Sequence, residues 1–151
     1  HGWYRRQRQM CIRDRSPIEI EFKNKNVLLV DDSIVRGNTS KKIVEMVRKQ
    51  GAKSVYFASA APPVRYQNVY GIDMPATKEL VAHGKTVEEV RHFIGADELI
   101  YQDIEDLRMA AHIGNTNITS FEDSVFTGKY RAGKISEEYL SRLENNRSSK
   151  E

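Results

Sequence analysis

The chain has 151 residues, of which 39% are hydrophobic and 30% are charged, which is typical of one globular domain with a core of its own. It contains no apolar run as long as a membrane span and no apolar signal segment, and its single cysteine, Cys11, excludes an internal disulfide and a multi-cysteine metal site. We therefore expect a cytoplasmic protein without a membrane partner.

Residues 1–15 differ from the rest of the chain in their charge. The stretch HGWYRRQRQMCIRDR is rich in arginine and holds a single acid, and without it the formal net charge of +3 falls close to zero. Such a basic opening is compatible with a nucleic-acid or membrane arm, but we favour a disordered or artefactual leader. The basic balance therefore says little about partners, and we expect no nucleic acid among them.

The remaining residues alternate between strand and helix patterns. The apolar run from Asn26 to Val30 is typical of a buried parallel strand, Thr39 or Ser40 suits a helix N-cap, and Gly51 suits a helix end. In chain order we expect an extended lead-in (16–26), a strand (26–30), a helix (40–50), a strand (54–60) and a short strand running into a loop (68–75). Two short helices (76–84 and 86–95), a strand (98–103), a helix (104–114) and a C-terminal helix (136–145) follow. This alternation predicts an α/β fold with a parallel sheet.

Two adjacent acids and a polar loop follow the first strand in VLLVDDSIVRGNTS. Ligands of open parallel sheets bind at the carboxyl ends of the strands, where Asp31 and Asp32 stand. Their carboxylates suit adjacent ribose hydroxyls and a nearby Mg²⁺. The loop offers backbone N–H groups and hydroxyls and leads into a helix N-terminus, which favours a phosphate. The pattern predicts a ribose 5-phosphate site, although a solvated strand end and a plain helix cap would give the same pattern.

Two other protein classes share an apolar strand that ends in acids. A P-loop NTPase has one, but G-x-x-x-x-G-K-[ST] occurs nowhere in the chain. A response-regulator receiver also has a strand like VLLVDDS, and Asp73-Met74-Pro75 resembles its phospho-acceptor region. A receiver places spacer residues between the acceptor and Met-Pro, whereas Asp73 directly precedes Met74. Labelling of Asp73 by acetyl phosphate would be needed to revive this alternative.

The stretch VLLVDDSIVRGNTS strongly resembles the phosphoribosyl pyrophosphate motif of type I phosphoribosyltransferases. Three further stretches resemble the C-terminal part of amidophosphoribosyltransferases: YFASAAPPVRYQNVYGIDMP, ELVAHGKTVEEVRHFIGAD and FEDSVFTGKY. The resemblance covers residues 16–130 and implies the Rossmann-like parallel sheet of the type I fold, incomplete in this fragment. Residues 1–15 would then be a non-family leader, and residues 131–151 a polar, partly helical tail.

The family carries out the first committed step of de novo purine synthesis. Ammonia released from glutamine displaces pyrophosphate from phosphoribosyl pyrophosphate and gives 5-phosphoribosylamine. The resemblance implies a glycosyltransferase with Mg²⁺ as cofactor, purine nucleotides as inhibitors and a homo-oligomer at full length. Asp31 and Asp32 would hold the ribose hydroxyls and the metal, and Asp73, Met74 and Pro75 would lie near the acceptor and inhibitor sites. The residues implied to bind substrate are Asp31, Asp32, Ser33, Ile34, Val35, Arg36, Gly37, Asn38, Thr39 and Ser40.

The sequence departs from the family pattern at several points. Asn38 replaces the usual threonine, from which we expect mild weakening of phosphate binding at most. Asp123 and the single Cys11 leave no ligands for the iron–sulfur cluster that some members carry, so we expect none. The glutaminase domain, the pyrophosphate loop and the flexible loop do not occur in these 151 residues. Cys11 is internal and cannot replace an N-terminal nucleophile, which uses its own α-amine as base, so we expect no catalytic residue here and no turnover by the fragment alone.

A non-enzymatic hypothesis remains beside the enzymatic one. Some type I relatives keep the motif and lose catalysis, which would make the chain a phosphoribosyl-binding regulatory module. A regulator would carry a DNA-binding or other partner domain upstream in place of a glutaminase. Under either hypothesis, missing strands would leave an open sheet edge and exposed apolar surface.

A few other residues could be functional. His83, in an Ala-His-Gly turn, is expected to be structural, and His92 and His112 to lie on helix surfaces. Arg36 is expected to act in the phosphate loop, through its side chain or through its backbone N–H. Contacts of the pair Arg65-Tyr66 with another subunit or a nucleotide are a weaker hypothesis.

Overall fold

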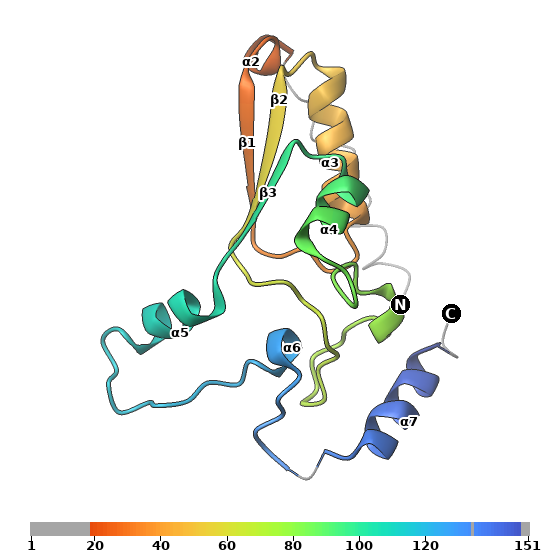
Figure 1. Cartoon of the computed structure of the whole chain (residues 1–151), viewed down its shortest axis with the longest axis vertical. Helices are drawn as coiled ribbons and strands as arrows, with labels where there is room; N and C mark the ends of the chain where they lie inside the picture. Colours follow the sequence, from red (N-terminus) through yellow and green to blue (C-terminus); the bar gives the residue numbers. More distant parts are fainter. Residues whose placement is uncertain (1–18, 134, 149–151) are drawn as a thin grey trace.

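The structure is a computed structural model that describes residues 19–133 and 135–148, so the expected leader lies outside the described residues. A parallel sheet with strand order β1-β2-β3 forms its upper part (Figure 1). Its strands are β1 (Asn26–Asp31), β2 (Ser54–Ser59) and β3 (Glu98–Tyr101). Helices separate these strands along the chain, which confirms the predicted α/β class.

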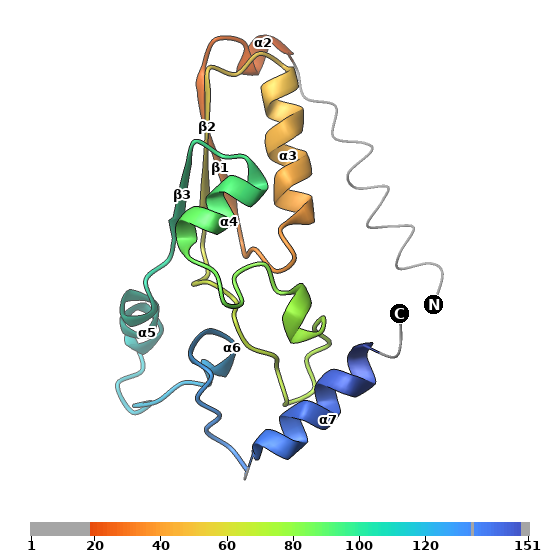
Figure 2. The ribbon, with the colours of Figure 1, turned by 45° about the vertical axis from the view of Figure 1, so that its right-hand side comes forward.

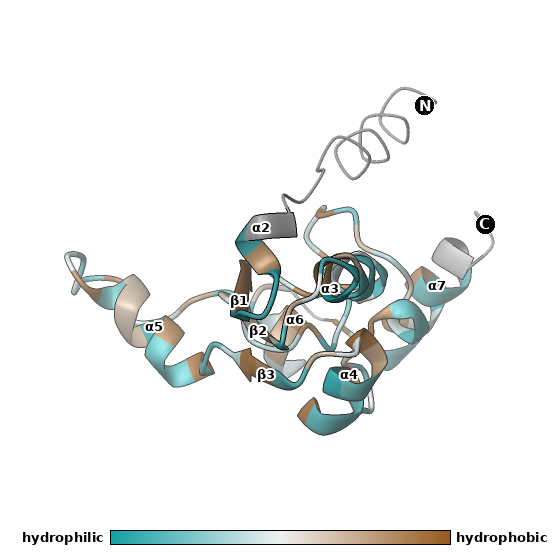
Figure 3. Ribbon diagram, turned by 90° about the horizontal axis from the view of Figure 1, so that it is seen from above, coloured by the Kyte–Doolittle hydropathy of each residue, from teal (hydrophilic) through white to brown (hydrophobic). Residues whose placement is uncertain are grey.

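Two helices cover one face of this sheet. Figure 3 shows α3 (Asn38–Lys49) and α4 (Val87–Ile94) on the same side of the three strands. Thr86 and Glu89 form a capping box at the start of α4, where the Glu89 amide donates to the Thr86 hydroxyl and the Glu89 carboxylate accepts from the Thr86 amide. Local sequence therefore fixes where α4 begins.

The hydrophobic core lies between the sheet and these two helices. Val44 and Val47, three residues apart on α3, face Val55 and Phe57 of β2, and all four are at most 1% exposed. Other buried members of this cluster are Ile34, Val81, Ala82, Val90, Ile94, Ala96 and Leu99. The register pairs Phe57 with Leu99, so the apolar layer runs across neighbouring strands.

The other face of the sheet exposes apolar side chains. Leu28, Val30 and Ile100 are 57%, 71% and 57% exposed, and the register places Val30, Ala58 and Ile100 in one row. Parallel sheets normally have both faces covered. The expectation of a buried first strand is therefore wrong, because one face of β1 is exposed and the other, with Val27 and Leu29, is only partly buried. The expected exposed apolar surface is present.

Several local expectations are wrong. Helix α3 begins at Asn38 with Gly37 as its N-cap, earlier than the expected cap, because Gly37 adopts φ 72°. The strand expected over residues 68–75 does not form, since the Asn68 side chain accepts from the amides of Tyr70 and Ile72 and bends the chain. The lead-in contains a short helix, α2 (Glu19–Phe22), instead of being extended.

The remaining helices lie beyond the carboxyl ends of the strands (Figure 2). Of the helix expected over residues 76–84, only one 3₁₀ turn forms, because the backbone is extended again at Leu80. The C-terminal helix is longer than expected, and a short helix before it was not predicted. These elements are η1 (Thr77–Glu79), α5 (Ile104–His112), α6 (Ser124–Thr127) and α7 (Glu137–Ser148). Within the described ranges, every helix is too short or too polar to cross a bilayer.

Candidate functional site

The acidic pair, Asp31 and Asp32, stands at the carboxyl end of β1. Asp31 is half-buried and accepts the Asp32 amide at 3.0 Å, and Asp32 is exposed and accepts the Ser33 hydroxyl at 3.2 Å. An ionised carboxylate offers about four lone-pair positions. Both acids therefore keep acceptor capacity for a ligand after these local hydrogen bonds are made.

The ends of the three strands are tied together beside the acidic pair. The Ala60 amide donates to the Asp31 carbonyl at 2.9 Å, and the Gln102 amide donates to the Ser59 carbonyl at 3.0 Å. These bonds continue the sheet ladder past the last strand residues. The acids thus stand on a fixed edge of the sheet, the edge where ligands of open parallel sheets bind.

The segment between the acids and α3, residues 33–37, is named the phosphate loop below. Ile34 anchors it in the core at 1% exposure. The Val35 carbonyl accepts the Val81 amide at 2.9 Å. Arg36 Nε donates to Glu79 Oε2 at 2.7 Å. The loop is therefore held along its length by residues that lie far from it in the sequence.

Gly37 closes the phosphate loop in a conformation that other residues rarely adopt. Its φ is 72°, and a Cβ built on it would lie 2.9 Å from Phe93 Cε1 and 3.2 Å from Val81 Cγ2. An alanine would be strained in the left-handed region and would also push against the Phe93 ring. Glycine at this position lets the loop pack directly against α4.

Helix α3 begins without a side-chain cap. Its N-cap residue is Gly37, which has no side chain to accept the first-turn amides, and the first turn holds no acid. The first amides of a helix lack partners within the helix, and the macrodipole favours an anion there. Asn38 and Thr39 are exposed at this end, whereas Ser40 is buried. The geometry suits a phosphate group next to the acidic pair.

The other predicted segment, residues 73–75, reaches this site through the residues that follow it. Asp73 is exposed, and Met74 and Pro75 are half-buried. The contacts with the phosphate loop come from Glu79 and Val81, a few residues further along the chain. The structure thus brings Glu79 and Val81, which follow the predicted segment, to the phosphate loop, whereas a role of residues 73–75 in acceptor or inhibitor binding stays a prediction.

The acidic pair also bears on metal binding. Among residues 19–133 and 135–148, no group of three or more His, Cys, Asp or Glu side chains could by itself hold a metal ion. Mg²⁺ commonly binds through one or two carboxylates, with water and substrate oxygens completing its shell. Two accessible acids at a strand end fit that mode of binding.

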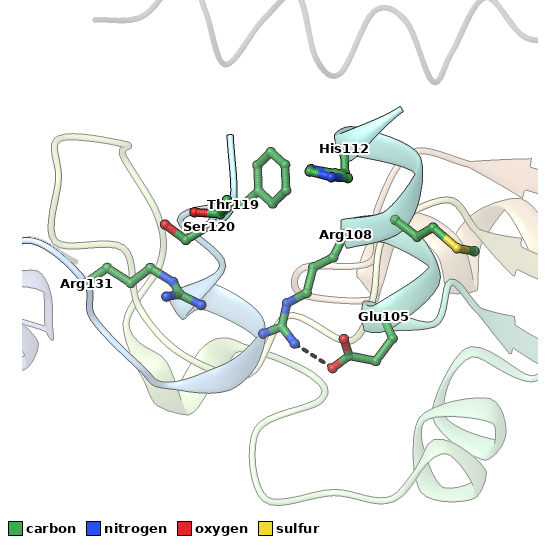
Figure 4. Close-up of a pocket in the computed structure, with 8 residues that line it drawn as sticks. Glu105, Arg108, His112, Thr119, Ser120 and Arg131 are labelled. Atoms are coloured by element: carbon green, nitrogen blue, oxygen red, sulfur yellow. Dashed lines mark hydrogen bonds and ion pairs between the residues drawn. The ribbon is translucent and has the colours of Figure 1, made fainter. Parts of the chain in front are cut away.

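Two cavities lie away from the acidic pair. The larger, about 650 Å³, is formed by α5 and the segments around residues 119 and 131 (Figure 4). Arg108 points into it but is ion-paired with Glu105 and with buried Asp123. Burial would raise the pKa of Asp123, but hydrogen bonds from Arg108 and Thr127 outweigh it and leave the pKa lowered. One of the two arginines that line this cavity, Arg108, is thus engaged by acids of the chain, and Arg131 is the other.

The smaller cavity, about 370 Å³, lies between the 66–67 segment, η1 and α7. The Glu144 carboxylate accepts the Thr77 amide there at 2.8 Å. Burial would raise the pKa of Glu144, but the hydrogen bonds from Thr77 and Lys78 lower it below its ordinary value. This cavity therefore contains a contact that fixes α7 on η1.

Comparison with known proteins gives a consistent result. No family model matches the chain. It is 56% identical over 135 residues to the amidophosphoribosyltransferase of Haemophilus influenzae, covering 89% of this chain and 27% of that protein. It is 50% identical over 145 residues to the Saccharomyces cerevisiae enzyme of the same name, covering 95% of this chain and 28% of that one. The chain belongs to the amidophosphoribosyltransferase family.

A solved structure extends this relationship to the fold. The glutamine phosphoribosylpyrophosphate amidotransferase of B. subtilis, complexed with ADP and GMP, superposes with a TM-score of 0.67 at 37% identity, over 81% of this chain and 27% of that one. The parallel sheet with its helices therefore matches that of amidophosphoribosyltransferase, as the sequence predicted. The chain spans 27–28% of the length of the relatives described here, which is consistent with the predicted fragment.

Sequence reasoning missed the residues that support the phosphate loop from behind, Glu79, Val81 and Phe93. Gly37 was the only available signal, because a glycine between a strand end and a helix often marks a positive φ or a close approach. For the remaining candidates, the His83 ring contacts the Arg65 carbonyl at 2.7 Å, and Arg65 donates to the carbonyls of Ala82 and Lys85. Both side chains are therefore engaged in holding the turn that contains His83.

Proposed function

We propose that the chain carries the ribose 5-phosphate and Mg²⁺ site of an enzyme that makes 5-phosphoribosylamine from phosphoribosyl pyrophosphate and glutamine. The observation that carries this proposal is the acidic pair at the end of β1, followed by the phosphate loop and the uncapped start of α3. This arrangement occurs in a chain that is 56% identical to an amidophosphoribosyltransferase over most of its length.

In this proposal each part of the site has one task. Asp31 and Asp32 accept hydrogen bonds from the two ribose hydroxyls, and the amides at the start of α3 bind the 5-phosphate. Bound Mg²⁺, held by the acidic pair together with substrate oxygens, would supply positive charge toward the leaving pyrophosphate. Substitution at C1 builds positive charge on the sugar, so positioning and charge stabilisation matter more than a protein nucleophile.

Partners follow from the same proposal. Ammonia would come from glutamine at a glutaminase site outside this chain, and the full-length protein would be a homo-oligomer. Purine nucleotides would inhibit near Asp73, Met74 and Pro75, an expectation supported by the ADP and GMP bound to the B. subtilis relative. The 151-residue chain should bind sugar phosphate weakly and release no pyrophosphate from phosphoribosyl pyrophosphate.

Calorimetric titration of the 151-residue chain with ribose 5-phosphate and Mg²⁺ tests the proposed site. Replacing both acids, Asp31→Asn with Asp32→Asn, should abolish measurable binding because the hydroxyls and the metal lose their charged acceptors. Asp106→Asn, an exposed acid on α5, is the matched control and should bind as the unchanged chain does. Unchanged affinity in the double variant would rule out the assignment.

A further inference from the structure

Arg36 is the only charged residue in the phosphate loop, and its side chain points to a partner within the chain. Its Nε donates to Glu79 Oε2 at 2.7 Å, and the other Glu79 oxygen accepts the Ala76 amide at 2.9 Å. One carboxylate thus joins the phosphate loop to the start of η1. The Arg36 side chain is 47% exposed and the Glu79 side chain 21%, so the pair lies at the surface with the acid as its more buried member.

The residues on either side of Arg36 contact the same part of the molecule. Val35 accepts the amide of Val81 through its carbonyl, and Gly37 packs against Phe93 and Val81. Three successive loop residues are therefore held by Glu79, Val81 and Phe93. The Arg36–Glu79 pair is the central one of these contacts and lies just before the first turn of α3.

The support continues beyond Glu79 to the C-terminal helix. Glu144 of α7 accepts the Thr77 amide at 2.8 Å. The preceding amide, that of Ala76, donates to Glu79. The 3₁₀ turn η1 is thus fixed on both sides, by Glu144 from α7 and by Glu79 toward the loop. A turn fixed in this way can act as a rigid base for the loop, as positioning residues require.

We propose that Glu79 is a positioning residue of the sugar-phosphate site, acting through Arg36 to hold the phosphate loop in its binding shape. This inference rests on the proposed function for its ligand. In this arrangement the phosphate is bound by backbone amides at the start of α3, and the Arg36 guanidinium braces the loop. The competing role for Arg36 is direct contact between its guanidinium and the phosphate, which would not need Glu79.

A double-mutant cycle on the 151-residue chain separates the two roles. Glu79→Gln keeps an oxygen for the Ala76 amide and removes the charge that faces Arg36, and Arg36→Met keeps most of the side-chain stem. Glu89→Gln is the matched control, because Glu89 also accepts an N-cap amide, that of Thr86, without contacting the loop. Two quantities are measured for each variant: the dissociation constant for ribose 5-phosphate with Mg²⁺, and the exchange rate of the Val81 amide without ligand.

The positioning role predicts that Glu79→Gln and Arg36→Met each weaken binding by roughly threefold to tenfold, and that the double variant is no weaker than either single one. Both single variants should also speed exchange of the Val81 amide, while Glu89→Gln changes neither quantity. Abolished binding in Arg36→Met together with unchanged binding in Glu79→Gln would overturn the proposal in favour of direct phosphate contact. If the unchanged chain binds no ribose 5-phosphate, the proposed function fails. Exchange of the Val81 amide then tests by itself whether Glu79 holds the loop through Arg36, and unchanged exchange in both single variants would overturn that role.

Discussion

The sheet layer, made of β1–β3, α3 and α4, and the C-terminal segment, residues 103–133 and 135–148, are stabilised by different interactions. In the sheet layer, a cluster of buried apolar side chains, at 7% exposure or less, lies between one face of the sheet and its two helices. In the C-terminal segment, α5 has no buried residue, and several polar contacts fix the chain. Examples are the Arg108–Asp123 ion pair and the bond from Gln67 Nε2 to the Leu140 carbonyl.

This difference matters for the candidate site, which lies between the two. Apolar packing is non-directional and tolerates small shifts, whereas hydrogen bonds fix distances and directions. The acidic pair is fixed by the sheet layer, and η1, which supports the phosphate loop, is fixed by Glu144 from the C-terminal segment. Substitutions of buried residues in the sheet layer should therefore lower the stability of the whole molecule, and substitutions in the C-terminal segment should act locally.

The largest effect is expected for Phe57→Ala. Phe57 is among the largest fully buried side chains, and deleting a buried aromatic ring typically costs about 3–5 kcal/mol. We expect the free energy of unfolding, measured by urea titration with circular dichroism, to fall by that amount. Leu28→Ala, on the exposed face of the same sheet, is the control and should change stability by less than about 1 kcal/mol. Equal losses in the two variants would show that the exposed face is covered in solution.

A smaller, local effect is expected for Arg108→Gln. Asp123 is 5% exposed and accepts two hydrogen bonds from Arg108, so this change leaves a buried carboxylate without its cation. Amides of α5 and α6 should exchange about tenfold faster with solvent while those of β2 stay unchanged, measured by hydrogen exchange. Arg142→Gln, an exposed arginine of α7, is the control. Faster exchange in β2 as well would mean that the two regions unfold together.

The smallest effect is expected from acid acting on Glu144. Its folded pKa is lowered by the amides of Thr77 and Lys78 against the opposing effect of burial. Because the pKa is lowered, the stabilisation by ionised Glu144 is fully present above the ordinary pKa of 4.5 and is lost as the pH falls through the pKa of the folded state. We expect the docking of α7 to weaken by about 1 kcal/mol over that range. The measurement is the pH dependence of the Thr77 amide resonance. Glu144→Gln should remove this dependence, and its persistence would assign it to another acid.

Short-range signals in the sequence were enough to predict the strands, α3, α4 and the position of the acidic pair. The apolar run before Asp31 and the capping residues Thr86 and Glu89 act within a few residues of themselves. The strand expected after Asn68 was wrong because one side-chain amide outweighed the β propensity of its neighbours. The Arg36–Glu79 ion pair could not be predicted, because the two residues lie 43 positions apart in the sequence and neither belongs to a motif that indicates the other.

The docking of α7 also has a consequence for the order of events during folding. Its contacts are long-range: Thr77 and Glu144 are separated by 67 positions, and Gln67 and Leu140 by 73. The paired residues of β1 and β2, such as Asn26 and Ser54, are separated by only 28 positions. Closing a longer loop costs more entropy, and non-local contacts form more slowly. We therefore expect the β1–α3–β2 unit to form first, with its acidic pair in place. The contacts that hold the phosphate loop through η1 should be complete only after α7 has docked.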